Sequence, residues 1–254
     1  MGVSNLLLKR LFTRHAKAPE TARDLRVVVV TATRGTEQEF WRDTRLGTTL
    51  PLAMFDGTVS LLIRCGNSDG LPAVYNAALD GLPDDTIALC IHDDVSLYDF
   101  YLGKRLEDGL EQFDVVGLAG NAKPDTQHTG WYYLRPPGGK MVAHDQTVLS
   151  GAVNHTDRSG QSVFSSFGPA PREVLLLDGL FLAFRVGSLR RHGVRFDERF
   201  TFHFYDLDFC RECVRHGLRL GTWPIAVGHE GAGHAAFETP EWERALALYR
   251  DKWR

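Results

Sequence analysis

The chain has 254 residues, of which 43% are hydrophobic and 24% charged, a composition that excludes disordered, collagen-like and disulfide-scaffold proteins. Lys and Arg total 29 against 32 Asp and Glu, so the net charge is −3 and no overall basic field would attract nucleic acid. No window approaches the roughly 20 apolar residues that a membrane-spanning helix needs.

The four cysteines are too scattered to form the disulfide framework of a small secreted domain, which favours a reducing, cytoplasmic location. Cys210 and Cys213 have the spacing of half a zinc site, but no second pair with suitable spacing follows them. We therefore expect both to be small buried side chains on one helix.

Residues 1–25 are predicted to form a basic amphipathic segment, followed by a single domain over 26–254. Residues 1–19 contain four Lys or Arg and no acidic residue, together with several leucines. Lys9 and Arg10 interrupt the apolar run, so the segment is not the core of a secretory signal. Two alternatives stay open: a helix lying on an anionic membrane surface, or a terminal helix that is frayed or packed on the domain.

The first half of the domain alternates strand-like and helical patterns. Residues 26–33 hold a run of β-branched residues without polar alternation, which is typical of a strand buried on both faces of a parallel sheet. Strands alternating with helices predict an α/β fold with a mostly parallel central sheet flanked by helices. The further strands are expected at 58–64, 86–91 and 115–120, and the helices at 36–46, 71–80 and 98–113.

The second half is less regular. Residues 121–172 are rich in Gly, Pro, Ser, Thr, His and aromatic residues, and predict either a set of short strands or a long functional loop region. Strand-like character returns over 173–185, interrupted at Asp178 and Gly179. A helix, a strand and a last helix are then predicted at 206–216, 218–227 and 240–253.

His92, Asp93 and Asp94 directly follow the predicted strand 86–91. In open α/β sheets, ligands bind outside the carboxyl ends of the strands, so carboxylates at this position are placed to hold a cation. Mg²⁺ and Mn²⁺ take oxygen ligands and often bridge carboxylates to substrate phosphates. The alternative interpretation is a helix cap or a solvated turn.

Two later segments carry further candidates. Asp206 and Asp208 lie where a helix is predicted to begin, and because free N–H groups and the helix dipole favour an acid there, capping explains one of them but not both. His229 and His234 lie in a glycine-rich segment after a strand. A histidine can complete a cation site, although a lone loop histidine is usually solvated.

Over residues 26–235, this order of motifs resembles family 2 of the inverting glycosyltransferases, and most closely its bacterial members with a His-x-Asp variant of the metal motif. The resemblance implies a GT-A fold, which is Rossmann-like and binds nucleotide sugars, and a divalent cation, Mn²⁺ or Mg²⁺. It implies that Asp94 and His229 bind the cation and that Asp206 is the catalytic base. The nucleotide-binding positions that it implies are Thr31, Thr33, Asn67, Asn76, His92 and Asp93.

On the acceptor side, the resemblance matches Asp178 and Gly179 to a stretch that faces donor and acceptor. Asp208 is expected to cap the helix or orient the acceptor, since it lies near the positive end of the helix dipole. Trp131 represents the aromatic residues of 121–172, whose flat faces suit the apolar faces of sugars; ordinary loop packing is the alternative for them.

Two positions depart from the family pattern. Arg64, Cys65 and Gly66 end the second strand where an acidic residue often reads the uracil, and Tyr205 stands where an acid often precedes the base. The resemblance nevertheless implies an enzyme that moves a sugar from a nucleotide-diphosphate donor, UDP- or dTDP-linked, to a hydroxyl of a glycan, lipid-linked or protein acceptor. The alternatives are a nucleotidyltransferase and an inactive glycosyltransferase-like protein that binds nucleotide or glycan.

Overall fold

The computed structural model describes residues 26–254 except 56, 124–128, 136–138, 157–158 and 231–236. The predicted amphipathic segment 1–25 therefore lies outside the described residues, as does His234. Within the part that is described, no helix is long and apolar enough to cross a membrane.

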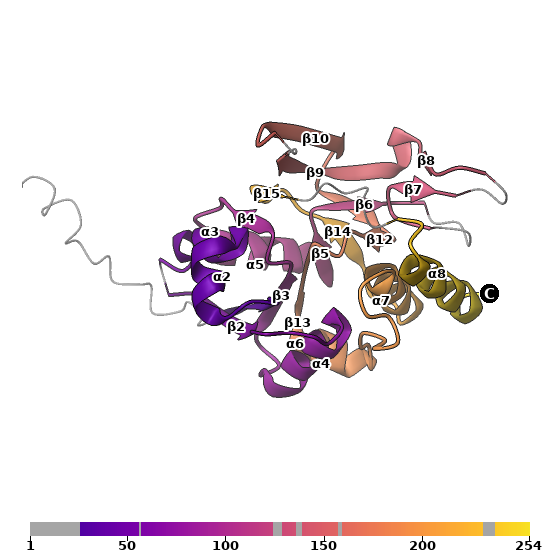
Figure 1. Cartoon of the computed structure of the whole chain (residues 1–254). Coiled ribbons are helices and arrows are strands. Elements are labelled where there is room, and N and C mark those ends of the chain that lie inside the picture. Colours follow the sequence, from indigo (N-terminus) through magenta and orange to yellow (C-terminus); the bar gives the residue numbers. More distant parts are fainter. Residues whose placement is uncertain (1–25, 56, 124–128, 136–138, 157–158, 231–236) are drawn as a thin grey trace, which may run out of the picture.

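A mixed sheet forms the centre of the molecule (Figure 1). Its strands among the described residues are, in spatial order, β11 (Arg172–Val174), β14 (Leu220–Thr222), β5 (Val115–Gly117), β13 (Phe181–Arg185), β3 (Ile87–Ile91), β1 (Val27–Ala32) and β2 (Val59–Arg64). The strands β2, β1 and β3 are parallel, whereas β13 runs antiparallel between β3 and β5. The α/β fold with a helix-flanked sheet is confirmed, but the sheet is less parallel than predicted.

The difference arises where the chain leaves the sheet. After β5 the chain passes straight into a second sheet, adds the edge strand β11 to the first sheet, and enters the first sheet again as β13, with no described crossover α-helix between β5 and β13. Parallel pairing needs such a crossover, so the returning strand runs the opposite way. The second sheet has the order β12 (Leu176–Leu177), β6 (Ala119–Asn121), β9 (Leu149–Thr156), β15 (Val227–His229) and β4 (Val95–Leu97), with β10 (Ser162–Gly168) paired to β9.

Helices cover both faces of the central sheet, which explains why β1 is buried along its whole length. Val27 and Val29 of β1 belong to one apolar layer, and Val28 and Val30 to the other. The first layer includes residues of α2 (Glu37–Asp43), α3 (Arg45–Ala53) and α5 (Leu102–Gln112). The second includes residues of α4 (Leu71–Gly81), α6 (Val186–His192), α7 (Tyr205–Arg215) and α8 (Pro240–Lys252).

Most predicted elements are present with shifted ends. The single helix expected at 36–46 is two helices, because Thr44 ends α2 and its hydroxyl caps α3 by accepting from the Gly47 N–H. Residues 121–172 form short strands, including the pair β7 (Tyr133–Leu134) and β8 (Val142–Ala143), and the 3₁₀ turn η1 (Gln146–Val148). Cys210 and Cys213 are buried on α7, as predicted.

Candidate active site

The candidate site forms where the chain passes between the two sheets. Residues 92–94 link β3 to β4, and residues 178–180 link β12 to β13. Because β13 pairs with β3, with Phe181 opposite Ile91, the two links lie side by side. The His92 N–H donates to the Leu180 carbonyl at 3.2 Å, which ties the links together.

Asp94 and His229 form the first polar pair of the site. In the β4–β15 ladder His229 lies opposite Val95, and its Nε2 is 3.4 Å from Asp94 Oδ2. Burial opposes ionisation of both groups, but their mutual attraction outweighs it and leaves the pKa of Asp94 below and that of His229 above its usual value. Asp94 Oδ1 and His229 Nδ1 are buried and have no hydrogen-bond partner among the described residues.

The side chains of Asp94 and His229 have the donor chemistry of a divalent cation site. A buried polar atom without a partner is costly, and a carboxylate oxygen with an imidazole nitrogen is a donor set that Mn²⁺ accepts. No group of three or more His, Cys, Asp or Glu within the described ranges is arranged to hold a metal. The pair would therefore leave further coordination positions to substrate phosphates and water, as is common for Mg²⁺ sites.

Asp206 and Asp178 form the second polar pair. Asp206 lies in the first turn of α7, and its Oδ2 accepts from the Gly179 N–H at 3.1 Å. Asp178 is fixed by the Leu180 N–H at 3.0 Å and by the Trp131 indole N–H at 2.8 Å. Burial, reinforced by the charge of Asp178, raises the pKa of Asp206 to about 7. A carboxyl group poised near neutral pH has the acidity of an efficient general base.

Gly179 permits this close approach of α7. A Cβ at this position would lie 2.5 Å from the Tyr205 hydroxyl oxygen and 2.8 Å from the Asp206 Cβ. The glycine predicted to interrupt strand-like character is therefore the point at which the backbone meets the start of α7.

Tyr205 connects the two links, a role that its departure from the family pattern did not reveal. Its hydroxyl donates to the Gly179 carbonyl at 2.8 Å and lies 2.9 Å from His92 Nε2. Burial lowers the pKa of His92, which favours the neutral ring as donor to the tyrosine oxygen. The signal in the sequence was an aromatic residue with a polar tip directly before the candidate base.

Some of the predicted nucleotide-binding residues lie together near the ends of β1 and β3, whereas others are enclosed within the fold. Thr33 and Asp93 lie together at the ends of β1 and β3, where burial raises the pKa of Asp93 and a hydrogen bond from Thr33 opposes that rise. Asn67 lies beside them, since its N–H donates to the Thr33 carbonyl at 2.9 Å. Thr31, in contrast, is 0% exposed within β1.

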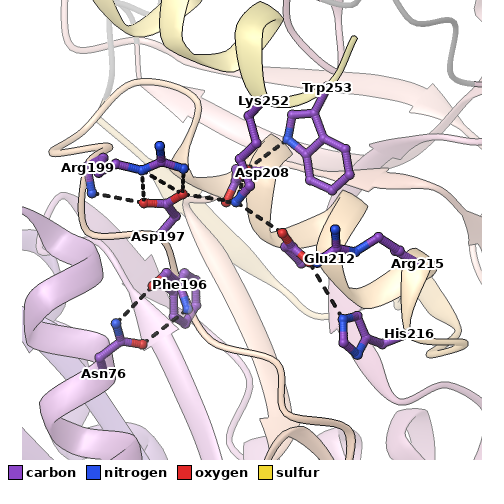
Figure 2. Close-up of polar contacts among 10 residues, drawn as sticks. All are labelled: Asn76, Phe196, Asp197, Arg199, Asp208, Glu212, Arg215, His216, Lys252 and Trp253. Carbon is purple, nitrogen blue, oxygen red and sulfur yellow. Dashed lines mark hydrogen bonds and ion pairs between the residues drawn. The ribbon is translucent and has the colours of Figure 1, made fainter.

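Asn76 and Asp208 are bonded to other parts of the chain and serve its packing (Figure 2). The amide of Asn76 is bonded to both backbone groups of Phe196 and to Glu198, which leaves little capacity for a nucleotide. Asp208 is 0% exposed and is bonded to Lys252 and Trp253. It does not cap α7, whose N-cap residue Phe204 makes no side-chain capping bond.

No protein-family model and no curated protein matches the chain. Among solved structures, similarity is found to GalNAc-T7 with UDP, GalNAc and Mn²⁺ (TM-score 0.45, 10% identity, covering 82% of this chain and 44% of that one). TarS from S. aureus gives a TM-score of 0.46 at 12% identity (88% and 65% covered), and A197 from STIV one of 0.41 at 13% (80% and 83%). The chain thus spans less than half of the GalNAc-T7 chain, and similarities this distant do not assign a family.

Proposed function

We propose that the chain is a metal-dependent inverting glycosyltransferase of the GT-A type, related to family 2. The observation that carries the proposal is Asp206, a carboxylate held against a second carboxylate with its pKa raised to about 7. The Asp94–His229 pair, with its unsatisfied oxygen and nitrogen atoms, belongs to the same junction between the two sheets.

Each group has a distinct task in this proposal. Asp206 takes the proton of an acceptor hydroxyl as that oxygen attacks the anomeric carbon, and the nucleoside diphosphate leaves from the opposite face, so the centre inverts. Asp94 and His229 hold the cation, which when bound neutralises negative charge on the departing diphosphate. Tyr205 and His92 hold the Gly179 backbone, whose N–H fixes the position of the base.

The donor is proposed to be a UDP- or dTDP-sugar, with Thr33, Asn67 and Asp93 at its nucleotide end. The acceptor is proposed to be a glycan, lipid-linked or protein hydroxyl that reaches Asp206 past Trp131. Trp131 belongs to an aromatic group with Tyr132 and Phe167, at ring-centroid distances of 5.5 Å and 4.9 Å. Cytoplasmic localisation and a peripheral membrane contact through residues 1–19 stay predictions from the sequence.

The test is a panel of nucleotide sugars and free nucleotides, measured by thermal shift with Mn²⁺ and with a chelator. A ligand at about 100 times its Kd stabilises the folded state by roughly 2.7 kcal/mol, so a true donor should raise the melting temperature clearly. We expect a nucleotide diphosphate sugar to stabilise the chain only with the metal, and donor turnover to follow for the same compound.

Other outcomes separate the alternatives. Metal-dependent binding without hydrolysis or transfer on a broad acceptor panel would indicate an inactive nucleotide-binding protein. Pyrophosphate release from a nucleoside triphosphate and a sugar phosphate would indicate a nucleotidyltransferase instead. Stabilisation by no compound of the panel, with or without Mn²⁺, would contradict the proposal.

A further inference from the structure

The C-terminal end of α8 is bonded to α7 by a buried network of charges (Figure 2). The Lys252 ammonium lies 2.8 Å from Asp208, 3.0 Å from Asp197 and 3.1 Å from Glu212. The side chain of Lys252 is 18% exposed and that of Asp208 0%. Trp253 adds an indole N–H that donates to Asp208 Oδ1 at 2.8 Å. Such a network demands one arrangement of its members, since removing one partner leaves buried charges uncompensated.

The backbone just before the candidate base is also held by α8. Phe204 has φ 66°, a left-handed conformation that is uncommon for a bulky residue. Its buried ring packs on Trp242 and Tyr249 of α8, at centroid distances of 5.4 Å and 5.3 Å. A strained backbone of this kind persists only where its surroundings impose it, and here they are the aromatic side chains of α8.

Asp206 therefore lies between two points at which α8 holds α7. Phe204 precedes it and Asp208 follows it, and the Asp208 N–H donates to the Phe204 carbonyl at 2.9 Å. None of the contacts of Lys252 and Trp253 in this network involves Asp206, Asp178 or Gly179. Their bonds to Asp208 reach the base through the first turn of α7.

We propose that Lys252 and Trp253 are positioning residues for Asp206: through Asp208 they lock the first turn of α7, which keeps the Asp206 carboxylate against the Gly179 N–H and opposite Asp178. The proposal rests on the proposed function for its kinetic consequence. Its structural consequence, the placement of Asp206 beside Asp178, does not depend on that function.

The first experiment measures the ionisation of Asp206 without any substrate, by ¹³C NMR of aspartate-labelled full-length protein, with Asp206→Asn identifying the signal. The titratable groups that face Asp206 are Asp178 from the 178–180 link, Tyr205 and Cys210 of α7 and Tyr249 of α8, with His92 behind Tyr205. In Lys252→Met, loosening of the turn moves Asp206 away from Asp178, so its titration midpoint should fall by about one pH unit. The matched control is Arg250→Met, which removes an exposed positive charge from the same helix.

The second experiment measures turnover of the donor identified above. Lys252→Met should lower kcat about tenfold or more with little change in the donor KM, since only the base is displaced. Lys252→Arg, which keeps the charge, should recover most of that activity, and Arg250→Met should behave as the unmodified chain. If Lys252→Met does not fold, Trp253→Phe replaces it, because that change keeps an aromatic side chain and removes the indole N–H donor.

The outcomes are distinguishable. Unchanged midpoint and kcat in the Lys252 and Trp253 variants, even with a lower melting temperature, would overturn the positioning role and leave a purely structural network. A shifted midpoint in a chain that transfers no sugar would support the positioning of Asp206 and refute the proposed function instead.

Discussion

Asp206 and Asp208 lie two residues apart on α7, yet their carboxylates face opposite surroundings. Asp208 is enclosed with Lys252 and the Trp253 N–H, which favour its charged form, although burial is stronger and leaves its pKa above the usual value. Asp206 faces Asp178, no cationic side chain among the described residues is bonded to it, and its pKa is raised to about 7. The charge of one carboxylate meets bonded partners within the fold, whereas that of the other meets a second carboxylate. Substitutions of these acids and of the proposed metal ligands test this division between an acid that serves the fold and an acid that serves the reaction.

The largest effect is expected from Asp206→Asn. The change keeps the shape of the side chain but removes the proton acceptor, so turnover should fall about 1,000-fold while donor affinity persists. Steady-state kinetics and calorimetry on the same preparation measure both quantities. If this variant turned over normally and a folded Asp208→Asn variant were inactive, the base would have been assigned to the wrong carboxylate.

Removal of the proposed metal pair should come next in size. Asp94→Asn and His229→Ala should each weaken Mn²⁺-dependent donor binding about 10- to 100-fold, and each should also lower stability, because the remaining partner of the buried pair loses its attraction. Calorimetry with donor, with and without Mn²⁺, checks this expectation. His234→Ala, in the same glycine-rich segment, is the matched control and should leave donor affinity nearly unchanged. Equal small losses of donor affinity in the His229 and His234 variants would refute the ligand role of His229.

Asp208→Asn should show the reverse pattern. It removes the charge opposite Lys252, so the free energy of unfolding should fall by roughly 1–3 kcal/mol, measured by urea denaturation. Turnover should persist at a reduced level, because Asp206 itself is retained. A variant as stable as the unmodified chain would mean that Asp197 and Glu212 compensate Lys252 without Asp208.

The sequence predicted this division only in part. The burial of β1, the α/β class and the segments that carry His92–Asp94, Asp206 and His229 follow from local patterns, since a β-branched run or an acid after a strand has a short-range cause. The packing contacts of Asn76 and Asp208 could not be read from the sequence, because their partners, Phe196 and Lys252, lie far away in the chain. A family pattern indicates which positions carry functional acids. It does not show which of two neighbouring acids is paired with a basic side chain elsewhere in the fold.

The strand-like character of β13 was predicted, but its antiparallel direction was not, for the same reason. The link 178–180 looked like an interruption of one strand, and only the pairing of β12 with β6 and of β13 with β3 shows that it joins two sheets. That junction also creates the site, because it brings Gly179 and Asp178 against the start of α7. Contacts between residues this far apart in the chain leave no periodic pattern in the sequence.

The smallest predicted effect concerns stability in the absence of ligand. The pKa of Asp206 is raised from 3.8 to about 7 in the folded chain, so the folded state binds a proton more tightly than the unfolded state. Stability should therefore decline as pH rises from about 4 to 7, and the penalty should be complete above that range. Asp206→Asn removes this penalty, and the variant should gain roughly 1–2 kcal/mol over the unmodified chain between pH 4 and pH 8, the full shift being reduced by residual solvent access. Urea denaturation of both proteins at the two pH values measures that difference. A parallel pH dependence in the two proteins would mean that Asp206 ionises as an ordinary surface acid, which would remove the contrast with Asp208.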